Sequence, residues 1–465
     1  MDLPENFTES MKDLLGSEYD DFIRSYDNSP VSGLRVNTCK ISCDEFERIA
    51  PYGISKIPFT ENGYYISDTD EWSKHPYYFA GLYYIQEPSA MLPATVLPVD
   101  KGDRVLDLCS APGGKSTQLI CRHPALLVSN DISHSRTIPL VKNLELFGNG
   151  QYSVTCCDPA DLAQRLPMCF DKILVDAPCS GEGMFRRDPG LVRAYRDKGP
   201  ESYSDIQSRI LENAYDMLRP GGYMLYSTCT FSDIEDEQVI LRLLGKHSDL
   251  SVCDIRNVEG LSAPYRKYDN VPIIAGCAHA FPHKIRGEGH FLTLIHKEGE
   301  YKGSDTSNCE GFISFNDLPG QILELFRFLT EEALSFIRSK RFLMSKDSYI
   351  YMLPDSFGDV YDKSIRYVRT GTCIGLINKN GKFNVHTAFA LALKSRDFSN
   401  RISFAAGDPD VYKYLKGETL VLDETHTSGI SCGYVLVCVD DHPLGFAKYD
   451  SNKLKNLYEK GWVYR

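Results

Sequence analysis

Ile173-Leu174-Val175-Asp176-Ala177-Pro178-Cys179-Ser180-Gly181 is a stretch in which an apolar run ends in a carboxylate, a proline and a thiol. A short apolar run bounded by turn residues is typical of a buried strand, so this stretch predicts a strand with reactive groups at its carboxyl end. A second run, Tyr223-Met224-Leu225, leads in the same way into Tyr226-Ser227-Thr228-Cys229-Thr230. Two thiols therefore follow two predicted strands, and the question is whether they share one site.

Short apolar runs alternate with helical stretches throughout the middle of the chain. Alternation of this kind is typical of a parallel sheet with helices on both faces. The predicted strands are 104–108, 125–129, 152–155, 172–175 and 223–226. The sequence therefore predicts an α/β protein whose central domain has a Rossmann-like fold.

Two helices between these strands carry clear sequence signals. Ser204 and Gln207 have the spacing of a capping box, and the stretch 219–222 (Arg-Pro-Gly-Gly) is typical of a helix stop, so a helix is predicted between them. After Ser133 the apolar pattern contains Pro139. Because proline lacks an N–H and clashes with the preceding turn, we expect it to kink this helix or to delay its start.

The segments on both sides of the sheet predict further domains. A helical start followed by strand-like runs at 34–38 and 64–66 is typical of a small α/β domain, and the last ninety residues have the short runs and tight turns of a β-rich one. The predicted domains are a small α/β domain at 1–90, the Rossmann-like domain at 91–300, a linker with a small α/β segment at 301–372, and a β-rich domain at 373–465.

The net charge gives no simple prediction about a nucleic-acid partner. The chain has 465 residues and a formal charge of −12, which argues against such a partner because phosphate binding draws on Lys and Arg. The charge is unevenly spread, since residues 301–465 hold 21 basic against 20 acidic residues and residues 1–300 hold 30 against 43. Within the more basic part, residues 338–382 hold nine basic and four acidic residues. This segment is either an RNA-facing patch or a solvated face.

The cysteines and the start of the chain predict a compartment. No two of the fifteen cysteines have the Cys-x-x-Cys spacing of a zinc site, so we expect reduced thiols and no metal ion. The first residues lack the basic and apolar regions of a signal peptide, and no run of 18 apolar residues could cross a membrane. We expect a cytoplasmic monomer without a membrane partner.

The loop after the first predicted strand is Asp107-Leu108-Cys109-Ser110-Ala111-Pro112-Gly113-Gly114-Lys115-Ser116-Thr117. Its Gly-Lys-Ser end imitates a phosphate-binding loop, but such a loop needs glycine where Cys109 stands, and Pro112 removes a backbone N–H that phosphates would use. The alternative is a glycine turn that lets an adenosyl ligand lie close to the backbone at the carboxyl ends of the strands.

Carboxylates follow four successive predicted strands, namely Asp107, Asp131, Asp158 and Asp176. Any one of them could be only a helix cap, which is common for an aspartate after a strand. As a set they predict more, because Asp131 is placed to hold ribose hydroxyls and Asp158 to accept a bond from an adenine amino group. Since the chain lacks a dinucleotide Gly-x-Gly-x-x-Gly in this loop, the set predicts S-adenosylmethionine as the ligand.

The two thiols suggest a reaction for that ligand. A lone cysteine is most often a buried structural residue, but Cys179 and Cys229 both stand among small or polar residues at the ligand edge. A thiolate that attacks carbon 6 of cytosine, helped by a proton or hydrogen bond at ring nitrogen 3, makes carbon 5 able to accept a methyl group. The adduct must then lose the proton from carbon 5 and expel the thiol, and a second thiol could assist this step.

The sequence resembles the Sun/Fmu-type RNA cytosine-5 methyltransferases over nearly its whole length. The segments that match their signature motifs are 107–117, 176–183 (Asp-Ala-Pro-Cys-Ser-Gly-Glu-Gly) and 226–230. Further blocks that resemble the family are 34–38 (Leu-Arg-Val-Asn-Thr), 84–89, and Pro282-His283 with 287–291. The tail segments 443–446, 454–456 and Gly461-Trp462 are similar to a PUA-like RNA-binding domain.

This resemblance implies S-adenosylmethionine-dependent methylation of carbon 5 of a flipped-out cytosine in ribosomal RNA of the small (16S) subunit. Residues 1–90 would then position the RNA, and a PUA-like domain at 373–465 would bind it. Cys229 would be the nucleophile, Cys179 would help to release the product, Asp176 would contact the cytosine, and Lys115 would lie near the methyl donor. The implied cofactor-binding residues are Cys109, Ser110, Ala111, Pro112, Gly113, Gly114, Lys115, Asp131, Arg136, Asp158 and Asp176.

Two other functions fit parts of the sequence. An amino-group methyltransferase typically has Asn/Asp-Pro-Pro-Tyr/Phe after the fourth strand, whereas Asp176-Ala177-Pro178-Cys179 stands here and offers no aromatic ring for stacking. An RNA-binding assembly factor with an idle cofactor fold would have no need for the two thiols, the acid and the glycine turn together. Cofactor binding without methyl transfer would favour the assembly factor.

Overall fold

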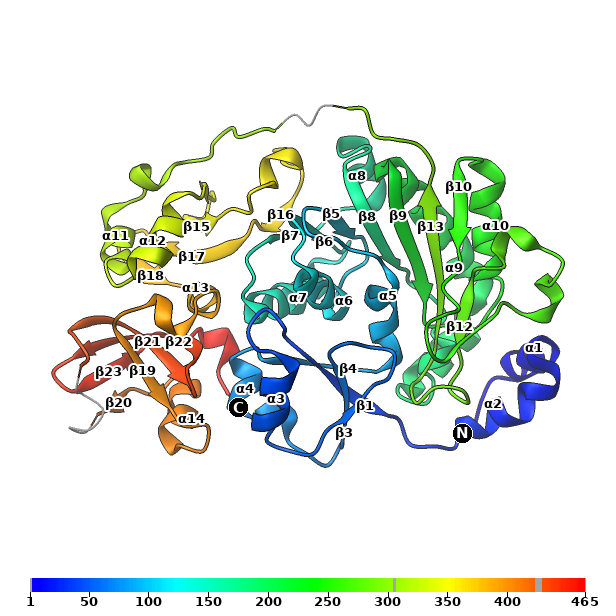
Figure 1. Cartoon of the computed structure of the whole chain (residues 1–465), viewed down its shortest axis with the longest axis horizontal. Coiled ribbons are helices and arrows are strands. Elements are labelled where there is room, and N and C mark those ends of the chain that lie inside the picture. The colour runs from blue at the N-terminus through cyan, green and yellow to red at the C-terminus, as the bar shows by residue number, and fades with distance from the viewer. Residues whose placement is uncertain (1, 304–306, 423–428, 465) are drawn as a thin grey trace.

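The computed structural model describes residues 2–303, 307–422 and 429–464. Figure 1 shows a large central sheet, a small sheet formed by the first ninety residues below it, and the C-terminal elements on the left. Among the described residues, none of the helices combines the length and the apolar character needed to span a bilayer.

The N-terminal part is a four-stranded antiparallel sheet with short helices. The strand order is β2-β3-β1-β4. The two helices at the start of the chain lie at the lower right of Figure 1, on the side of the central sheet where β12 lies. Its elements are α1 (Glu5–Leu15), α2 (Tyr19–Ser25), β1 (Ser32–Val36), α3 (Cys43–Ile49), β2 (Ser55–Lys56), β3 (Gly63–Ile66), α4 (Pro76–Phe79) and β4 (Tyr83–Gln86).

The central sheet has the predicted parallel core. The five predicted strands correspond to β5 (Arg104–Asp107), β6 (Leu126–Asn130), β7 (Tyr152–Thr155), β8 (Phe170–Asp176) and β9 (Leu218–Thr228). They pair in parallel in the order β7-β6-β5-β8-β9. The strand order therefore reverses at β5, because β6 and β7 lie on one side of it and β8 and β9 on the other. Open α/β sheets bind ligands at such a switch point, beyond the carboxyl ends of the strands.

The sheet is mixed, not purely parallel, because antiparallel strands extend both of its sides. On one side β13 (His290–Lys297) pairs with β9. Both β10 (Leu250–Cys253) and β12 (Ala278–Ala280) pair with β13, and β11 (Leu261–Ser262) pairs with β12. On the other side β16 (Tyr367–Arg369), from the C-terminal third, pairs with β7. Antiparallel edge strands on a parallel core are common in large sheets, and only the core had an alternating βα pattern to reveal it.

The helices of the central part are α5 (Leu92–Val96), α6 (Gly114–Leu119), α7 (His134–Phe147), α8 (Pro159–Arg165), α9 (Pro189–Met217) and α10 (Glu237–Lys246). The capping box at Ser204 is wrong, because Ser204 lies inside α9. The break in α9 falls at Gly199, with φ of +66°, and Pro200 follows it at the first position of the second half, where a missing N–H costs nothing. Pro139 does not delay α7, which begins at His134 and continues through it.

The C-terminal third forms two more sheets. The first has the order β14-β15-β17-β18 and the second β19-β21-β22-β23-β20, and the first extends across residue 373, the predicted domain boundary. The elements are α11 (Gly320–Phe326), α12 (Glu331–Arg338), β14 (Phe342–Met344), β15 (Tyr349–Met352), β17 (Thr372–Ile377), β18 (Phe383–Val385), α13 (Thr387–Leu391), β19 (Arg401–Phe404), α14 (Pro409–Leu415), β20 (Leu420–Val421), β21 (Gly433–Val439), β22 (His442–Asp450) and β23 (Lys453–Asn456).

A buried arginine joins the N-terminal sheet to the central one. Arg35 on β1 is fully buried, and its guanidinium donates to the carbonyl of Gly114 at 2.9 Å and to Thr117 Oγ1 at 2.7 Å. Its Nε donates to Gln86 Oε1 at 3.2 Å. Because Gly114 begins α6, this contact holds the glycine turn against the N-terminal sheet.

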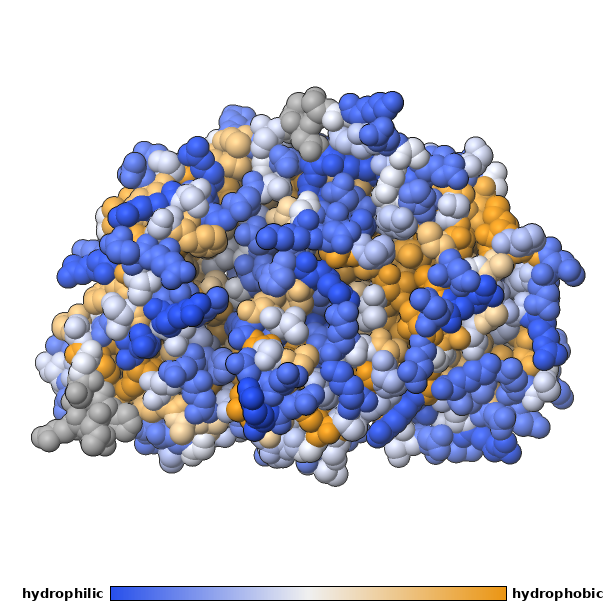
Figure 2. All heavy atoms as spheres, viewed as in Figure 1, coloured by the Kyte–Doolittle hydropathy of each residue, from blue (hydrophilic) through white to orange (hydrophobic). Residues whose placement is uncertain are grey.

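The surface agrees with a charged chain. Figure 2 shows hydrophobic residues over the antiparallel side of the central sheet and over parts of the C-terminal elements on the left, with hydrophilic residues over much of the rest of this face.

Candidate active site

A cavity of about 550 Å³ lies beyond the carboxyl ends of the parallel strands, where the switch point predicts a ligand. It brings together groups that stand far apart in the sequence. The predicted site residues that line it are Cys109, Ala111, Asp131, Arg136, Asp158, Asp176, Cys179 and Cys229. The two thiols therefore do face one cavity.

A smaller cavity of about 290 Å³ lies beside the first, between the glycine turn and β4. Cys109, Ala111 and Asp176 line both cavities. The predicted residues that line only the smaller one are Asp107, Ser110, Pro112, Gly114 and Lys115. The carboxylate of Asp176 thus stands where the two cavities meet.

The turn before α6 requires glycine at position 113. Gly113 has φ of +106° and caps the helix, and a Cβ atom placed on it would lie 3.0 Å from Leu140 Cδ1. A side chain would therefore be strained and would also crowd α7. Below the turn, Ser116 Oγ donates to Asp107 Oδ2 at 2.6 Å, and burial raises the pKa of Asp107 to about 7.

The two thiols form a close pair. Cys179 Sγ and Cys229 Sγ lie 3.2 Å apart, and both side chains are half-buried. The hydrogen bond to Cys229, together with burial, raises the pKa of Cys179 well above its usual value. The two sulfur atoms are therefore joined by one S–H···S hydrogen bond, in which either sulfur can donate.

The thiol loops are held by a neighbouring hydroxyl pair and a carboxyl. Ser180 Oγ and Thr230 Oγ1 lie 2.8 Å apart, and the backbone N–H of Ser180 donates to Glu235 Oε2 at 2.9 Å. Burial raises the pKa of Glu235 to about 7. Each contact joins the residue after one of the thiols to the other loop or to Glu235, so the positions of both sulfur atoms are fixed together.

Asp176 is held as an ionised acceptor. Lys115 Nζ donates to Asp176 Oδ2 at 2.7 Å, and Ser227 Oγ donates to Oδ1 at 2.8 Å. His290 Nε2 lies 4.0 Å from the same carboxylate. Burial works in the opposite direction, but the charges and hydrogen bonds of these neighbours lower the pKa of Asp176 below its usual range.

Asp131 is placed for a polar ligand. It is buried, its Oδ1 accepts from the N–H of Ser133 at 2.9 Å, and its Oδ2 accepts from the N–H of Ala111 at 3.3 Å. The exposed guanidinium of Arg136 lies 3.4 Å from Oδ2 and also donates to the carbonyl of Ala111 at 2.8 Å. Arg136 therefore braces Asp131 against the turn from the rim of the cavity.

Asp158 has two roles in the structure. It caps α8, where its Oδ1 accepts from the N–H of Ala160 at 2.9 Å, which is the common structural role of such an aspartate. It also lines the 550 Å³ cavity. Three of the four strand-end carboxylates thus line the larger cavity, and Asp107 lines the smaller one.

The sequence reasoning missed three groups that position the site, namely Ser227, Glu235 and His290. Ser227 stands within the motif quoted for Cys229, and His290 within the block 287–291. Both therefore belong to recognised motifs, but the sequence predicted no function for either. Glu235 had no signal, because its contact with the Cys179 loop depends on how the chain folds back after β9.

The basic segment 338–382 is partly neutralised by acidic partners. Lys340 Nζ lies 2.6 Å from Asp355, Lys363 pairs with Glu310, and Arg369 Nε lies 2.9 Å from the buried Glu145. This segment therefore offers fewer free cations than its composition suggests.

Comparison with known proteins gives family matches for three segments of the chain. Residues 94–296 match the family model of 16S rRNA methyltransferase RsmB/F, residues 3–88 match the N-terminal domain of 16S rRNA methyltransferase RsmF, and residues 401–464 match the RsmF PUA domain. Methyltransferases of the RsmB/F type take the methyl group from S-adenosylmethionine, as the sequence predicts.

Curated relatives match almost from end to end. The ribosomal RNA small subunit methyltransferase F of Shewanella sp. (strain MR-4) is 30% identical over 96% of this chain and 93% of its own length. The enzyme of that name from Erwinia tasmaniensis is 29% identical over 99% and 96%. Among solved structures, a methyltransferase homologue from Pyrococcus horikoshii is 25% identical, covers 64% of this chain and 96% of its own, and gives a TM-score of 0.55. The chain belongs to the RsmF family of methyltransferases that act on ribosomal RNA of the small subunit.

Proposed function

We propose that the enzyme methylates carbon 5 of a cytosine in 16S ribosomal RNA through a covalent bond between Cys229 and carbon 6 of the base. The observation that carries this proposal is the pair of thiols 3.2 Å apart, with Asp176 on the same cavity wall. Methylation of an amino group needs no thiol nucleophile, so the pair favours carbon as the site of transfer.

The 550 Å³ cavity fits the methyl donor in size and in polar groups. Ligand cavities for molecules of this size span about 300–1,000 Å³. The carboxylate of Asp131 can accept from ribose hydroxyls, and Asp158 can accept from the adenine amino group, while the glycine turn lets the ligand approach the backbone. When bound, S-adenosylmethionine supplies an electrophilic methyl group on a sulfonium.

Cys229 is the proposed nucleophile. The raised pKa of Cys179 keeps that thiol protonated, so Cys229 is the proposed thiolate of the pair. Its sulfur forms a bond to carbon 6 of the cytosine, and the electron pair displaced from the ring double bond makes carbon 5 nucleophilic. Carbon 5 then accepts the methyl group.

Asp176 is proposed to bind the target base, and Lys115 is proposed to hold the carboxylate of Asp176 in position. As an ionised acceptor, Asp176 suits the exocyclic amino group of cytosine. When the base covers the carboxylate, water is excluded and the pKa of Asp176 should rise, which would allow it to share a proton with ring nitrogen 3. Lys115 keeps the carboxylate at the meeting point of the two cavities.

Cys179 is proposed to complete the reaction. As the bond between Cys229 and carbon 6 breaks, the Cys179 thiol can give its proton to the departing sulfur at 3.2 Å. In the same step the sulfur of Cys179 takes the proton from carbon 5, and the electron pair of that C–H bond restores the ring double bond as the bond to Cys229 breaks. The pair then holds two protons, one more than before the attack, and loss of one proton to water restores the Cys229 thiolate.

We propose that the N-terminal part positions the RNA, that the PUA part binds it, and that the enzyme works as a monomer in the cytoplasm, where it meets ribosomal RNA. Structured RNA is recognised largely by shape, so the acidic central part does not require a strongly basic groove.

The test is nucleoside analysis of small-subunit RNA after reaction with the full chain. Subunits from a strain that lacks the gene should gain 5-methylcytidine when S-adenosylmethionine is added, and the position that gains it should be unmethylated in bisulfite sequencing of that strain. Formation of a base-amine product instead of 5-methylcytidine would overturn the proposal.

A further inference from the structure

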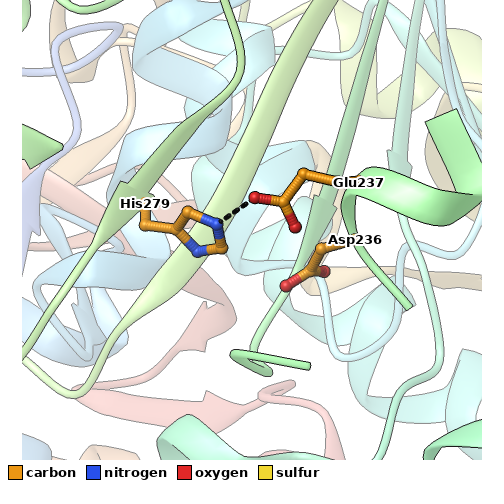
Figure 3. A group of neighbouring side chains, drawn as sticks. All are labelled: Asp236, Glu237 and His279. Atoms are coloured by element: carbon orange, nitrogen blue, oxygen red, sulfur yellow. Dashed lines mark hydrogen bonds and ion pairs between the residues drawn. The ribbon is translucent and has the colours of Figure 1, made fainter. Parts of the chain in front are cut away.

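A second cluster of polar side chains lies next to Thr228, the residue before Cys229. Asp236, Glu237 and His279 are each fully buried, and each offers one ligand atom within 4.8 Å of the other two. Figure 3 shows the two carboxylates, at the start of α10, turned toward the imidazole of His279 on β12. His279 Nε2 lies 2.8 Å from Glu237 Oε1. No step of the proposed reaction uses this cluster.

The cluster has more hydrogen-bonding capacity than the surrounding protein satisfies. Within the described part of the chain, Asp236 Oδ2, Glu237 Oε2 and His279 Nδ1 are buried and have no hydrogen-bond partner. Buried polar atoms in native proteins are almost always paired, and exceptions commonly mark an ion or water. Three such atoms on three neighbouring side chains indicate a missing partner.

The charge around the cluster points to a cation. Five carboxyl groups are buried in this region, namely Glu182, Asp233, Glu235, Asp236 and Glu237. Among the described residues, the ion pairs to this group are Lys267 with Asp233 at 2.6 Å and His279 with Glu237. Buried charges in proteins are paired or coordinate metals. Because two ion pairs serve five buried carboxyl groups, this region has less positive charge than it needs.

We propose that Asp236, Glu237 and His279 bind one divalent transition-metal ion, with zinc as the ion that best suits the set. Zinc accepts imidazole nitrogen and carboxylate oxygen together, whereas magnesium and calcium favour oxygen alone. The prediction of no metal came from cysteine spacing, which bears on thiolate sites only. A site with two carboxylates and one histidine from distant segments has no such spacing.

The ion would be structural and would act on the position of the nucleophile. Thr228, the residue before Cys229, donates from Oγ1 to Asp236 Oδ1 at 2.6 Å. Asp236 would therefore join the end of β9 to the ion, and His279 would join the ion to β12, which pairs with β13 and through it with β9. Loss of the ion would loosen the loop that carries Cys229.

The competing explanation is a proton. Burial and the neighbouring charge of Glu237 raise the pKa of Asp236 well above its usual value, so a protonated Asp236 beside a Glu237–His279 pair would also relieve the repulsion. The two explanations differ in metal content, which can be measured directly.

The experiment is elemental analysis of the full chain, purified without chelator or affinity metal and then dialysed against zinc or manganese. We expect about one equivalent of zinc in the wild type and less than about a tenth in Asp236→Asn and His279→Gln, since each removes a ligand. The midpoint of thermal unfolding should rise with added zinc in the wild type but not in Asp236→Asn or His279→Gln. Circular dichroism shows whether each variant is folded.

Two controls keep the result tied to this site. Cys179→Ala should keep its zinc, which separates the cluster from adventitious binding by the thiol pair. Asp254→Asn removes an exposed carboxylate outside the cluster and should keep its zinc as well. Less than about a tenth of an equivalent of either ion in the wild type, with no thermal response, would overturn the proposal. Retention of the metal in folded Asp236→Asn and His279→Gln would also overturn it.

Discussion

Cys179 Sγ and Cys229 Sγ lie 3.2 Å apart although fifty residues separate the two cysteines in the chain. The parallel register of β8 and β9 explains this, because it places Asp176 opposite Ser227. Cys179 follows three residues after Asp176, and Cys229 follows two residues after Ser227. One strand pair therefore brings the carboxylate and both sulfur atoms to the same cavity.

The first prediction concerns Lys115. Lys115→Met leaves Asp176 without its ammonium partner at 2.7 Å, so the pKa of Asp176 should rise and methyl transfer should fall about 100-fold or more. Removal of one partner of a largely buried pair should also lower the free energy of unfolding by about 2 kcal/mol, since Asp176 keeps some contact with water. Rates and urea unfolding measure the two effects.

Lys74→Met is the matched control, because Lys74 forms an exposed ion pair with Glu71. It should change stability by less than about 0.5 kcal/mol. Full activity of Lys115→Met would remove Lys115 from the proposed site.

The second prediction concerns pH and His290. Burial first, and the charge of Lys115 second, lower the pKa of His290 to about 4, whereas an unfolded histidine has a pKa of about 6.5. The unfolded chain therefore binds the extra proton between these values. The stability that neutral His290 contributes is complete above about pH 6.5 and is lost as pH falls toward about 4.

Urea unfolding at pH 7.5 and pH 5.5 tests this. The wild type should lose about 1 kcal/mol more than His290→Gln between the two pH values, and His134→Gln, at an exposed position, should follow the wild type. An identical pH dependence in the wild type and His290→Gln would contradict the assignment.

The third prediction concerns the methyl donor. Asp131→Asn removes the buried charge proposed to hold ribose and should weaken binding of S-adenosylmethionine by about 10- to 100-fold in calorimetry. Arg136→Ala should have a smaller effect, below about tenfold, because Arg136 is exposed and acts through Asp131. Asp161→Asn, on α8 outside the larger cavity, should bind normally. Equal affinity in Asp131→Asn and Asp161→Asn would speak against the ribose role.

The fourth prediction concerns the joint between the sheets. Arg35 donates to four acceptor atoms through a planar fork, which lysine cannot reproduce. Arg35→Lys should therefore lower the free energy of unfolding by about 3 kcal/mol and weaken cofactor binding, since Gly114 would lose its anchor. A variant with wild-type stability and affinity would show that the glycine turn is held without it.

The parallel core and the two thiols could be predicted because the information was local. Each strand was an apolar run, and Asp176, Cys179 and Cys229 came directly after such runs. The resemblance to a known family added the roles and the methyl donor. Comparison confirms the fold class, the donor and ribosomal RNA as substrate, whereas the site roles remain proposals.

The features that the sequence did not reveal depend on contacts between distant segments. The antiparallel strands around β13 and the added strand β16 have short, irregular patterns, and their pairing is decided by the sheet edge they meet. Ser204 had the local pattern of a helix cap, but Gly199 and Pro200 decide where the chain bends. Glu235 and His279 matter only because folding places them near the segments that carry the two thiols.

The most direct test of the central claim is a denaturing gel of the enzyme after incubation with substrate RNA and S-adenosylmethionine. Cys179→Ala should give a shifted band that contains both protein and RNA, because Cys229 attacks and release stalls. Cys229→Ala and the double variant should give no such band. A covalent band in Cys229→Ala but not in Cys179→Ala would reverse the two roles, and its absence from all the variants would contradict the covalent mechanism.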